Sequence, residues 1–147
     1  FPWRCPKCRK PAVYREKMSH TSQISHDGRM HTVNVPNLKV PRCRACNELV
    51  FDNEADEQIS LAFRAQLRML SPQQIRSGRT LLKLTQKELA ERLGVAVETI
   101  SRWETGALIQ SRAMDNLLRV YFAIRQVRSV LIGERQDAGL GVPCGVA

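Results

Sequence analysis

The sequence TQKELAERLGVAVETISRWETG, residues 85–106, decides the fold of the C-terminal half. Thr85 followed three residues later by Glu88 is a capping box, so a helix should begin at Gln86. Its apolar residues fall at helical spacing, and Gly94 ends it, because only glycine adopts the left-handed conformation without a steric cost. A second helix follows and ends at the final glycine. Two short helices joined by a glycine turn predict a helix-turn-helix, whose second helix lies in the major groove of DNA.

The second predicted helix has an inner and an outer side. Ile100 and Trp103 are three residues apart, so both belong on the side that faces the protein. The residues left to face outward or sideways are candidates for contact with DNA, and four of the five are polar: Val97, Glu98, Thr99, Ser101 and Arg102. Such a face suits a wet, hydrogen-bonding partner. The alternative is an ordinary helical hairpin with a solvated face.

This part of the chain resembles the Xre/Cro-type helix-turn-helix. The resemblance rests on the glutamine directly after the capping threonine, the Leu-Ala-x-x-Leu-Gly turn at 89–94 and the Trp-Glu-x-Gly ending at 103–106. Thr85, Gln86 and Lys87 stand at a helix N-terminus, where exposed N–H groups and the helix dipole favour anions. We therefore expect these three residues to hold DNA phosphates.

The charge of the chain, formally +9 over 147 residues, favours a polyanionic partner. It is concentrated in two parts, net +6 over residues 1–52 and net +5 over residues 71–132, with net −1 between them. Aromatic residues make up 5% of the chain, which argues against base-stacking platforms. No apolar run reaches ~18 residues and the N-terminus lacks a signal-peptide core, so we expect no membrane span and a reducing, cytoplasmic location.

Four cysteines form two Cys-x-x-Cys pairs with 34 residues between them: Cys5, Cys8, Cys43 and Cys46. A pair with this spacing brings both thiolates to one ion from a single turn of chain, and two pairs complete the tetrahedron that Zn²⁺ prefers. The alternatives are a redox pair or two disulfides, but redox motifs usually come singly beside a βαβ unit, and cytosolic disulfides are rare. Because four sulfurs fill the coordination sphere, the sequence predicts one structural zinc ion per chain.

The remaining candidate ligands have weaker claims. His20, His26 and His31 could each replace a cysteine, but with four well-spaced cysteines present we expect them to be exposed hairpin residues. Cys144 lies in a glycine-rich tail, residues 134–147, that we expect to be disordered, and we assign this thiol no role.

The N-terminal third is expected to be extended chain around the ion. Asp27-Gly28 is a hairpin signal, flanked by residues 12–25 and by alternating apolar residues at 33, 35, 38 and 40. Burial of these few apolar residues cannot by itself stabilise a unit of ~50 residues. We therefore expect the metal to provide much of its folding energy. From 53 to 70 the apolar spacing is helical, with Asp52 or Asn53 as cap. We expect this connecting helix to pack against the zinc unit or a dimer mate.

The connecting helix ends at Ser71-Pro72, where we place the boundary between a domain of residues 1–70 and one of 71–133. The second domain should hold five helices: one over 72–83, the two of the helix-turn-helix, one capped by Ser111 and one from about 126 to 131. The predicted fold class is α+β, with a small zinc-bound β-rich domain, a connecting helix and an all-α, five-helix, Xre/Cro-type domain. Apolar residues near its end exceed what such a bundle needs and would suit a subunit interface: Leu118, Phe122, Val127, Val130, Leu131 and Ile132.

Taken together, the chain resembles the MqsA family of two-domain bacterial antitoxins, also called YgiT-type proteins. The resemblance covers nearly everything from Cys5 to Leu131. It rests on the order and spacing of several motifs: Cys-Pro-x-Cys at 5–8, Cys-x-x-Cys and a following acidic residue at 43–48, the acidic-capped helix after it, Leu-Thr-Gln-Lys-Glu at 84–88, Ser-Arg-Trp-Glu-x-Gly at 101–106 and Leu-Leu-Arg-Val at 117–120.

The resemblance implies properties that the residues alone do not show. Such proteins dimerise through the C-terminal domain, bind a palindromic operator in double-stranded DNA and repress their own operon. Their zinc domain neutralises a co-encoded toxin, typically an mRNA-cleaving ribonuclease. The four zinc ligands of the family map onto the four paired cysteines of this chain.

The family's main base-reading arginine maps onto Arg102, which would donate two hydrogen bonds to a guanine. The second base-reading residue of the family is an asparagine, and here it is Glu98. A carboxylate accepts a hydrogen bond from cytosine N4 whereas asparagine pairs with adenine, so the operator should differ, or Glu98 turns inward and orients Arg102. The hinge between the domains is also shorter than the family's usual one.

The sequence therefore predicts a dimeric repressor that is the antitoxin of a type II toxin–antitoxin pair. The alternative is a stand-alone Xre-type regulator whose zinc domain binds another protein or only stabilises the fold. An enzyme is not expected, because the sequence offers neither a Ser-His-Asp set nor an open metal site.

Overall fold

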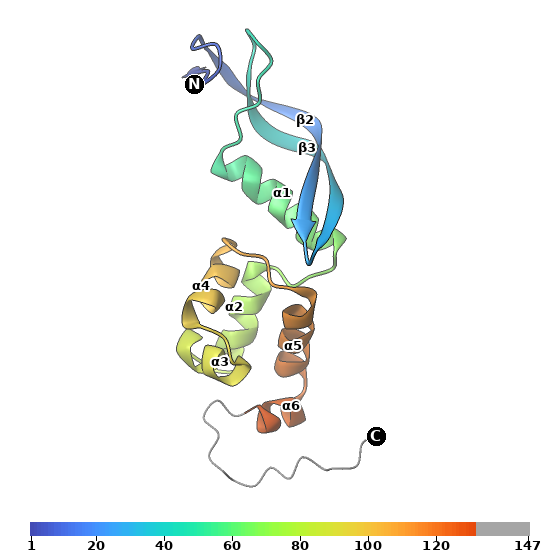
Figure 1. The fold of residues 1–147 in the computed structure, drawn as a ribbon. Helices are drawn as coiled ribbons and strands as arrows, with labels where there is room; N and C mark the ends of the chain where they lie inside the picture. The colour runs from blue at the N-terminus through green and yellow to red at the C-terminus, as the bar shows by residue number, and fades with distance from the viewer. Residues whose placement is uncertain (132–147) are drawn as a thin grey trace. The chain divides into compact units, whose positions relative to one another are not determined.

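The structure, a computed structural model, describes residues 1–131 and has an α+β fold (Figure 1). Within these residues a three-stranded antiparallel sheet of order β1-β2-β3 precedes six helices. The strands are β1 (Trp3–Arg4), β2 (Pro11–His26) and β3 (Arg29–Cys43). The helices are α1 (Asn53–Gln66), α2 (Pro72–Leu81), α3 (Gln86–Leu93), α4 (Val97–Thr105), α5 (Arg112–Ala123) and α6 (Arg125–Val130). The expected disordered tail, 134–147, and Cys144 lie outside the described residues.

The chain forms two compact units. The first contains Phe1–Ser71 together with Ile109–Arg112, and the second contains Pro72–Leu108 and the described residues from 113 onward. Gln110 belongs to the first unit, where its side chain is buried and its Nε2 donates to the carbonyl of Leu70 at 2.9 Å. None of the helices within residues 1–131 has the length and the apolar character needed to cross a membrane.

A long hairpin, β2 and β3, forms the body of the first unit. His26 pairs with Arg29 across a two-residue turn in which both Asp27 (φ 49°) and Gly28 (φ 71°) have positive φ. Positive φ at both central residues defines a type I′ turn, whose twist matches that of the strands it joins. The Asp-Gly signal in the sequence is therefore confirmed.

The apolar alternation of β3 changes phase because the strand carries a bulge. Val35 pairs with His20 and Leu38 pairs with Met18, so β3 has one residue more than β2 between these two pairs. The extra residue turns the side chains after it to the opposite face. All four apolar residues of β3 are therefore buried in one cluster, Val33, Val35, Leu38 and Val40.

Helix α1 covers this apolar face and completes the main core of the first unit (Figure 1). Ala55, Ile59 and Phe63 are buried against the valines and the leucine of β3, at the i, i+4, i+8 spacing that places them on one side of a helix. Two packing partners were expected for this helix, the zinc unit and a dimer mate. Within the chain, α1 packs against the zinc unit. The cap is Asp52, whose side chain accepts a hydrogen bond from the backbone N–H of Ala55.

Helix α1 ends at Gln66, four residues before the predicted end at 70. Arg68 has a left-handed conformation (φ 54°), and its N–H and that of Met69 donate to the carbonyls of Ala65 and Arg64. These two bonds form a Schellman motif, which stops a helix. The end was misplaced because such a stop usually carries glycine, whereas arginine occupies the position here.

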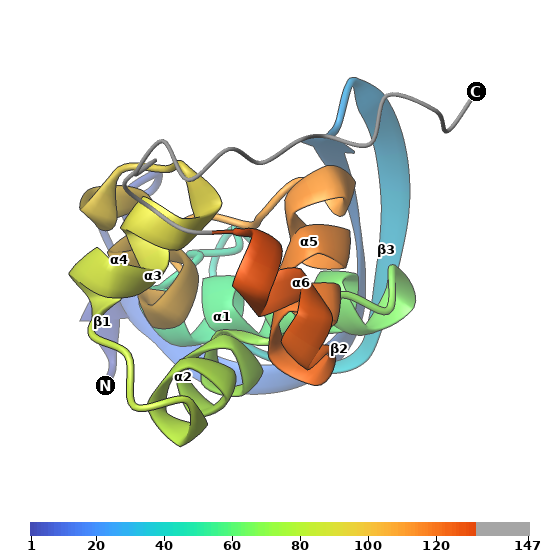
Figure 2. The same ribbon diagram turned by 90° about the horizontal axis from the view of Figure 1, so that it is seen from below.

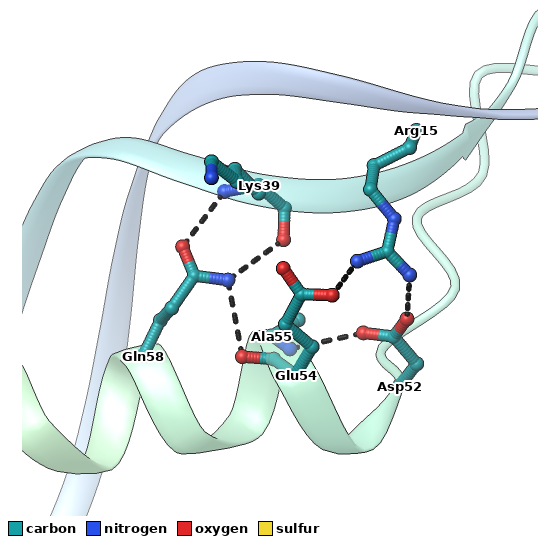
Figure 3. A network of polar contacts seen from close by, with 6 residues as sticks. All are labelled: Arg15, Lys39, Asp52, Glu54, Ala55 and Gln58. Atoms are coloured by element: carbon teal, nitrogen blue, oxygen red, sulfur yellow. Dashed lines mark hydrogen bonds and ion pairs between the residues drawn. The ribbon is translucent and has the colours of Figure 1, made fainter.

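Polar contacts fix α1 along the outer edge of β3 (Figure 3). Gln58 Oε1 accepts from the N–H of Lys39 at 3.0 Å, and Gln58 Nε2 donates to the Lys39 carbonyl at 3.0 Å. One side chain thus satisfies two backbone groups that an edge strand leaves unpaired. Arg15 of β2 binds the carboxylates of Asp52 and Glu54, so the capped end of α1 is also tied to the hairpin.

The three histidines are half-buried, so the prediction that they are exposed is wrong. The rings of His26 and His31 lie 5.6 and 5.4 Å from the ring of Phe63, and the ring of His20 lies 5.2 Å from that of Phe51. All three are on β2 or β3, on the sheet face that α1 and the segment before it cover. Their imidazoles therefore pack as flat, partly apolar groups on phenylalanine.

The second unit has a core of apolar side chains from α2 to α5. The fully buried residues include Ile75, Leu89, Ile100 and Leu118. Leu118 was predicted to lie at a subunit interface, and this is wrong, because the side chain is 0% exposed within its own chain. Of the other residues in that prediction, Val130 is 60% exposed, Phe122, Val127 and Leu131 are half-buried, and Ile132 lies outside the described residues.

Helix α2 ends at Leu81, two residues before the predicted end at 83. Lys83 is left-handed (φ 56°), and the N–H groups of Lys83 and Leu84 donate to the carbonyls of Thr80 and Arg79. This is again a Schellman motif with a basic residue where glycine is usual. Helix α5 begins at Arg112, directly after the predicted cap Ser111, and α6 begins and ends within one residue of its predicted limits.

Candidate metal centre and nucleic-acid interface

Two turns of similar geometry carry the four paired cysteines. In the first, the N–H of Cys5 donates to the Lys10 carbonyl and the N–H of Arg9 donates to the Cys5 carbonyl, both at 2.9 Å. In the second turn, built on Cys43, the N–H of Cys43 donates to the carbonyl of Glu48 and the N–H of Asn47 to that of Cys43, both at 2.8 Å. Arg9 and Asn47 both have positive φ. Each turn folds the chain back so that both of its sulfurs face one point.

The four sulfurs meet in a cluster that fits a tetrahedral metal ion. The Sγ atoms of Cys5 and Cys46 are 3.6 Å apart, those of Cys8 and Cys43 are also 3.6 Å apart, and all four lie within 4.8 Å of one another. A tetrahedron of thiolates around Zn²⁺ at ~2.3 Å requires sulfur–sulfur distances of about 3.8 Å. The residues therefore fit a structural metal site. None of the three histidines belongs to this group.

The thiols of the cluster differ in acidity. The backbone N–H of Cys8 is the largest cause that lowers the pKa of the Cys5 thiol from 9.0 to about 7. The backbone N–H of Glu48 likewise favours the thiolate of Cys46, but burial and hydrogen bonds with the other three thiols outweigh it and raise the pKa of Cys46 to about 12. Four thiolates so close together need a compensating cation, which a divalent metal supplies.

The cluster also organises a small core of its own. Cys5, Val13 and Cys43 are buried together, with Ala12 and Val50 packed against them. An exposed ion pair links the two turns, with Lys7 Nζ 2.8 Å from Glu48 Oε2. The hydrogen bond to Glu48 raises the pKa of Lys7, so this side chain stays charged. The metal site is therefore held by backbone geometry and packing, with little help from the salt bridge.

In the second unit, α3 and α4 are two short helices joined by residues 94–96. Thr85 caps α3 by accepting from the N–H of Glu88 at 3.1 Å, and its hydroxyl donates to the Glu88 carboxylate at 3.2 Å. Gly94 and Gly106, with φ of 74° and 84°, end the two helices in the left-handed conformation. The starts and stops predicted for residues 85–106 are thus observed.

Helix α4 has the expected inner and outer sides. Ile100 and Trp103 are buried, at 0% and 3% exposure. Of the predicted DNA-contacting residues on this helix, three are exposed and two are half-buried: Val97, Glu98 and Arg102 in the first group and Thr99 and Ser101 in the second. Within the described residues neither Glu98 nor Arg102 takes part in an ion pair, so Glu98 does not orient Arg102.

The residues at the start of α3 are placed differently from one another. Lys87 is exposed. Gln86 is half-buried, and its Nε2 donates to Glu104 Oε2 at 2.6 Å, so its side-chain amide is engaged inside the protein. Thr85 uses its hydroxyl as the helix cap. Of the three predicted phosphate ligands, only Lys87 has a side chain without such a partner.

Glu104 is a buried residue that the sequence analysis did not single out. It accepts a hydrogen bond from Arg79 Nε at 2.8 Å and one from Gln86, and its side chain is 0% exposed. Arg79 Nη1 also donates to the Leu84 carbonyl at 2.8 Å. These bonds join α2, the start of α3 and α4. The sequence contained a signal for the burial of Glu104, because Glu104 follows Ile100 by four residues and so lies on the same inward side of the helix.

Comparison with protein-family models gives a match over most of the chain. A family model described as the antitoxin component of a bacterial toxin–antitoxin system, MqsA, matches residues 3–126. The match spans both units, from the first cysteine turn to the start of α6. No curated protein matches the chain.

Proposed function

Because the chain belongs to the MqsA antitoxin family, we propose that it is a DNA-binding repressor whose zinc domain neutralises a cognate toxin. The protein acts in the cytoplasm as a homodimer on a palindromic operator. Each chain contributes one recognition helix, α4, and the two helices enter successive major grooves about one turn of B-DNA apart, ~34 Å.

The observation that carries the DNA-binding part is the division of α4 into two sides. Its inward residues Ile100, Trp103 and Glu104 are buried, whereas Glu98 and Arg102 are exposed and make no ion pair within residues 1–131. An arginine free of other partners can offer both guanidinium donors to guanine O6 and N7. A free Glu98 carboxylate can accept from cytosine N4, which gives this chain an operator of its own.

The test compares two arginines and one lysine on the DNA upstream of the gene. Arg102→Ala should lose about 1–3 kcal/mol on the operator and much less on unrelated duplexes, because a base contact is removed. Lys87→Ala should weaken binding to all duplexes similarly and lower the salt slope by about 1, because a phosphate contact is removed. Arg76→Ala, at an exposed position on α2, is the matched control. Equal losses for the Arg102 and Lys87 variants on every duplex would contradict the assignment.

For the antitoxin part, we propose that Zn²⁺ fixes the two cysteine turns of the first unit. The four cysteines bind one structural Zn²⁺, which supplies no catalytic position because thiolates fill its coordination sphere. Co-expression with each neighbouring open reading frame should identify one whose toxicity this chain suppresses, most simply an mRNA-cleaving ribonuclease. Suppression should persist in the Arg102→Ala variant, since toxin binding and base reading use different units.

Exposed apolar residues of the second unit support dimerisation. Val120, Ile124 and Val130 are 38%, 42% and 60% exposed. Three apolar side chains on α5, α6 and the residue between them suit a subunit interface better than water. Replacing Val130 by lysine should yield monomers in light scattering without loss of the helical signal, and a variant that stays dimeric would exclude this surface.

A second candidate is a stand-alone Xre-type regulator whose zinc domain binds another protein or only stabilises the fold. The helical unit would read DNA in the same way in either case. The two functions differ in the co-expression assay, where a stand-alone regulator would rescue no neighbouring toxin.

A further inference from the structure

A concave pocket in the second unit gathers three arginines. It has a volume of about 350 Å³ and is lined by Arg92 of α3, Arg125 and Arg128 of α6, Ser129, Tyr121 of α5 and two leucines between α2 and α3. Figure 2 looks onto this end of the unit, with α6 nearest the viewer. The pocket thus brings together positive charge from segments that are more than 30 residues apart in the sequence.

Among residues 1–131 the lining of the pocket includes no carboxylate. Within residues 1–131 none of the three arginines forms an ion pair, so no carboxylate neutralises their charges there. Converging guanidinium groups without a counterion repel one another, and an anion placed between them removes that repulsion. The pocket is therefore electrostatically suited to an anionic ligand.

One of the arginines is held in place by the backbone. Arg128 Nη1 donates to the carbonyls of Tyr121 at 2.8 Å and Phe122 at 3.1 Å, so the guanidinium is fixed at the last turn of α5 while its other nitrogens keep free donors. The positive charges of Arg92 and Arg128 act on the buried hydroxyl of Tyr121, opposing the rise in its pKa that burial causes. Arg92, Arg128 and Tyr121 also line the same pocket.

The pocket is distinct from the proposed DNA-contacting face. Arg92 follows Lys87 by five residues, which turns its side chain about 140° around the axis of α3. It also stands in the last turn of the helix, whereas the proposed phosphate contacts are in the first. Arg92 is thus not an extension of the row of residues that we propose to follow the DNA backbone.

We propose that this pocket binds a small organic phosphate. Arginine forks match the geometry of phosphate oxygens, and Ser129 and Tyr121 add hydroxyl groups. The volume is larger than a bare phosphate requires and lies in the range of small-molecule sites. The two leucines supply an apolar wall for the organic part of the ligand. The ligand would bind to α3, α5 and α6 of the unit that we propose to read DNA. DNA binding by this unit would then depend on the concentration of the ligand.

The test is calorimetric titration of the full-length, zinc-loaded protein with ADP and with pyrophosphate at constant ionic strength. Both probes should bind saturably with one site per chain. Arg92→Gln and Arg125→Gln should each weaken binding about tenfold, which is what loss of one charge-assisted contact produces. Arg76→Gln, which removes the same charge from an exposed position outside the pocket, should bind as the wild type does.

Two results would overturn the proposal. One is the absence of saturable binding, or a loss of affinity in the Arg76 variant equal to that in the pocket variants. Either outcome would mean that the probes respond only to the overall positive charge of the protein. The other is a salt slope of DNA binding that falls by about 2 in the Arg92/Arg125 double variant, which would assign the arginines to DNA phosphates. Arg125→Gln alone keeps the test valid if the double variant does not fold, because the Arg125 side chain is exposed and makes no hydrogen bond or ion pair within residues 1–131.

Discussion

Replacing Glu104 by alanine should strongly destabilise the second unit, because the change leaves a buried cation without its counterion. The carboxylate is 0% exposed and lies 2.8 Å from Arg79 Nε, and the Arg79 side chain is 13% exposed. Removal of one partner of a buried ion pair costs about 3–5 kcal/mol. The unpaired amide of Gln86, whose present distance from the carboxylate is 2.6 Å, adds about 1 kcal/mol.

Two further variants separate charge from shape. Glu104→Gln keeps the volume and one acceptor for Arg79 but loses the charge, so we expect a cost of about 1.5–3 kcal/mol. The double variant Arg79→Met with Glu104→Met removes both charges, and replacement of a whole buried pair by apolar residues is often close to neutral. The predicted order of stability is therefore double variant, then Glu104→Gln, then Glu104→Ala.

Urea unfolding followed by tryptophan fluorescence measures this order. Trp103 is 3% exposed and reports on the second unit, and a Trp3→Phe background removes the only other tryptophan. Protein concentration must be fixed, because dimer formation adds to apparent stability. At an m-value of about 1–2 kcal/mol per molar urea, the midpoint for Glu104→Ala should fall by about 2 M or more. A loss below about 1 kcal/mol, or a double variant as unstable as the single one, would refute the reasoning.

The remaining predictions concern the first unit. Chelation of the metal should release the two cysteine turns while the hairpin and α1 stay folded. Amide hydrogen exchange with and without chelator measures protection separately in each region. Simultaneous loss of protection in all regions would contradict this prediction. Asp52→Ala should cost about 1–2 kcal/mol, since a helix cap and a partly exposed contact with Arg15 are lost, and Asp52→Asn should recover most of the cap in thermal melts. Phe63→Ala should cost about 3–5 kcal/mol in urea unfolding and Phe63→Leu clearly less; similar values for the two would show that the site collapses around the cavity.

Features coded by local signals were predictable from the sequence. Thr85, Gly94 and Gly106 fix the limits of α3 and α4 through capping and left-handed φ, which depend only on neighbouring residues. The hairpin turn at Asp27-Gly28 follows from the same preference for positive φ. The cysteine quartet was predictable for a different reason, because a metal site restricts the spacing of its ligands.

Features that depend on distant contacts were not predictable. Arg68 and Lys83 end α1 and α2 in a conformation that glycine prefers, so no local signal marked either stop. His26 is half-buried only because Phe63, far along the chain, lies across it. Leu118 has the same helical spacing whether it faces a partner subunit or its own core, and only the packing of the second unit decides between them.

The placement of apolar residues limits what the metal does for the first unit. Sequence composition alone led us to expect that the metal supplies much of the folding energy. The structure instead shows two separate clusters, one of cysteines and Val13 and one in which α1 covers β3 with Phe63 at its centre. The second cluster contains seven buried residues and none of the metal ligands, so burial of apolar surface stabilises it without the ion. A partner that contacts the cysteine turns would therefore bind in a metal-dependent way, whereas one that contacts the hairpin and α1 would not.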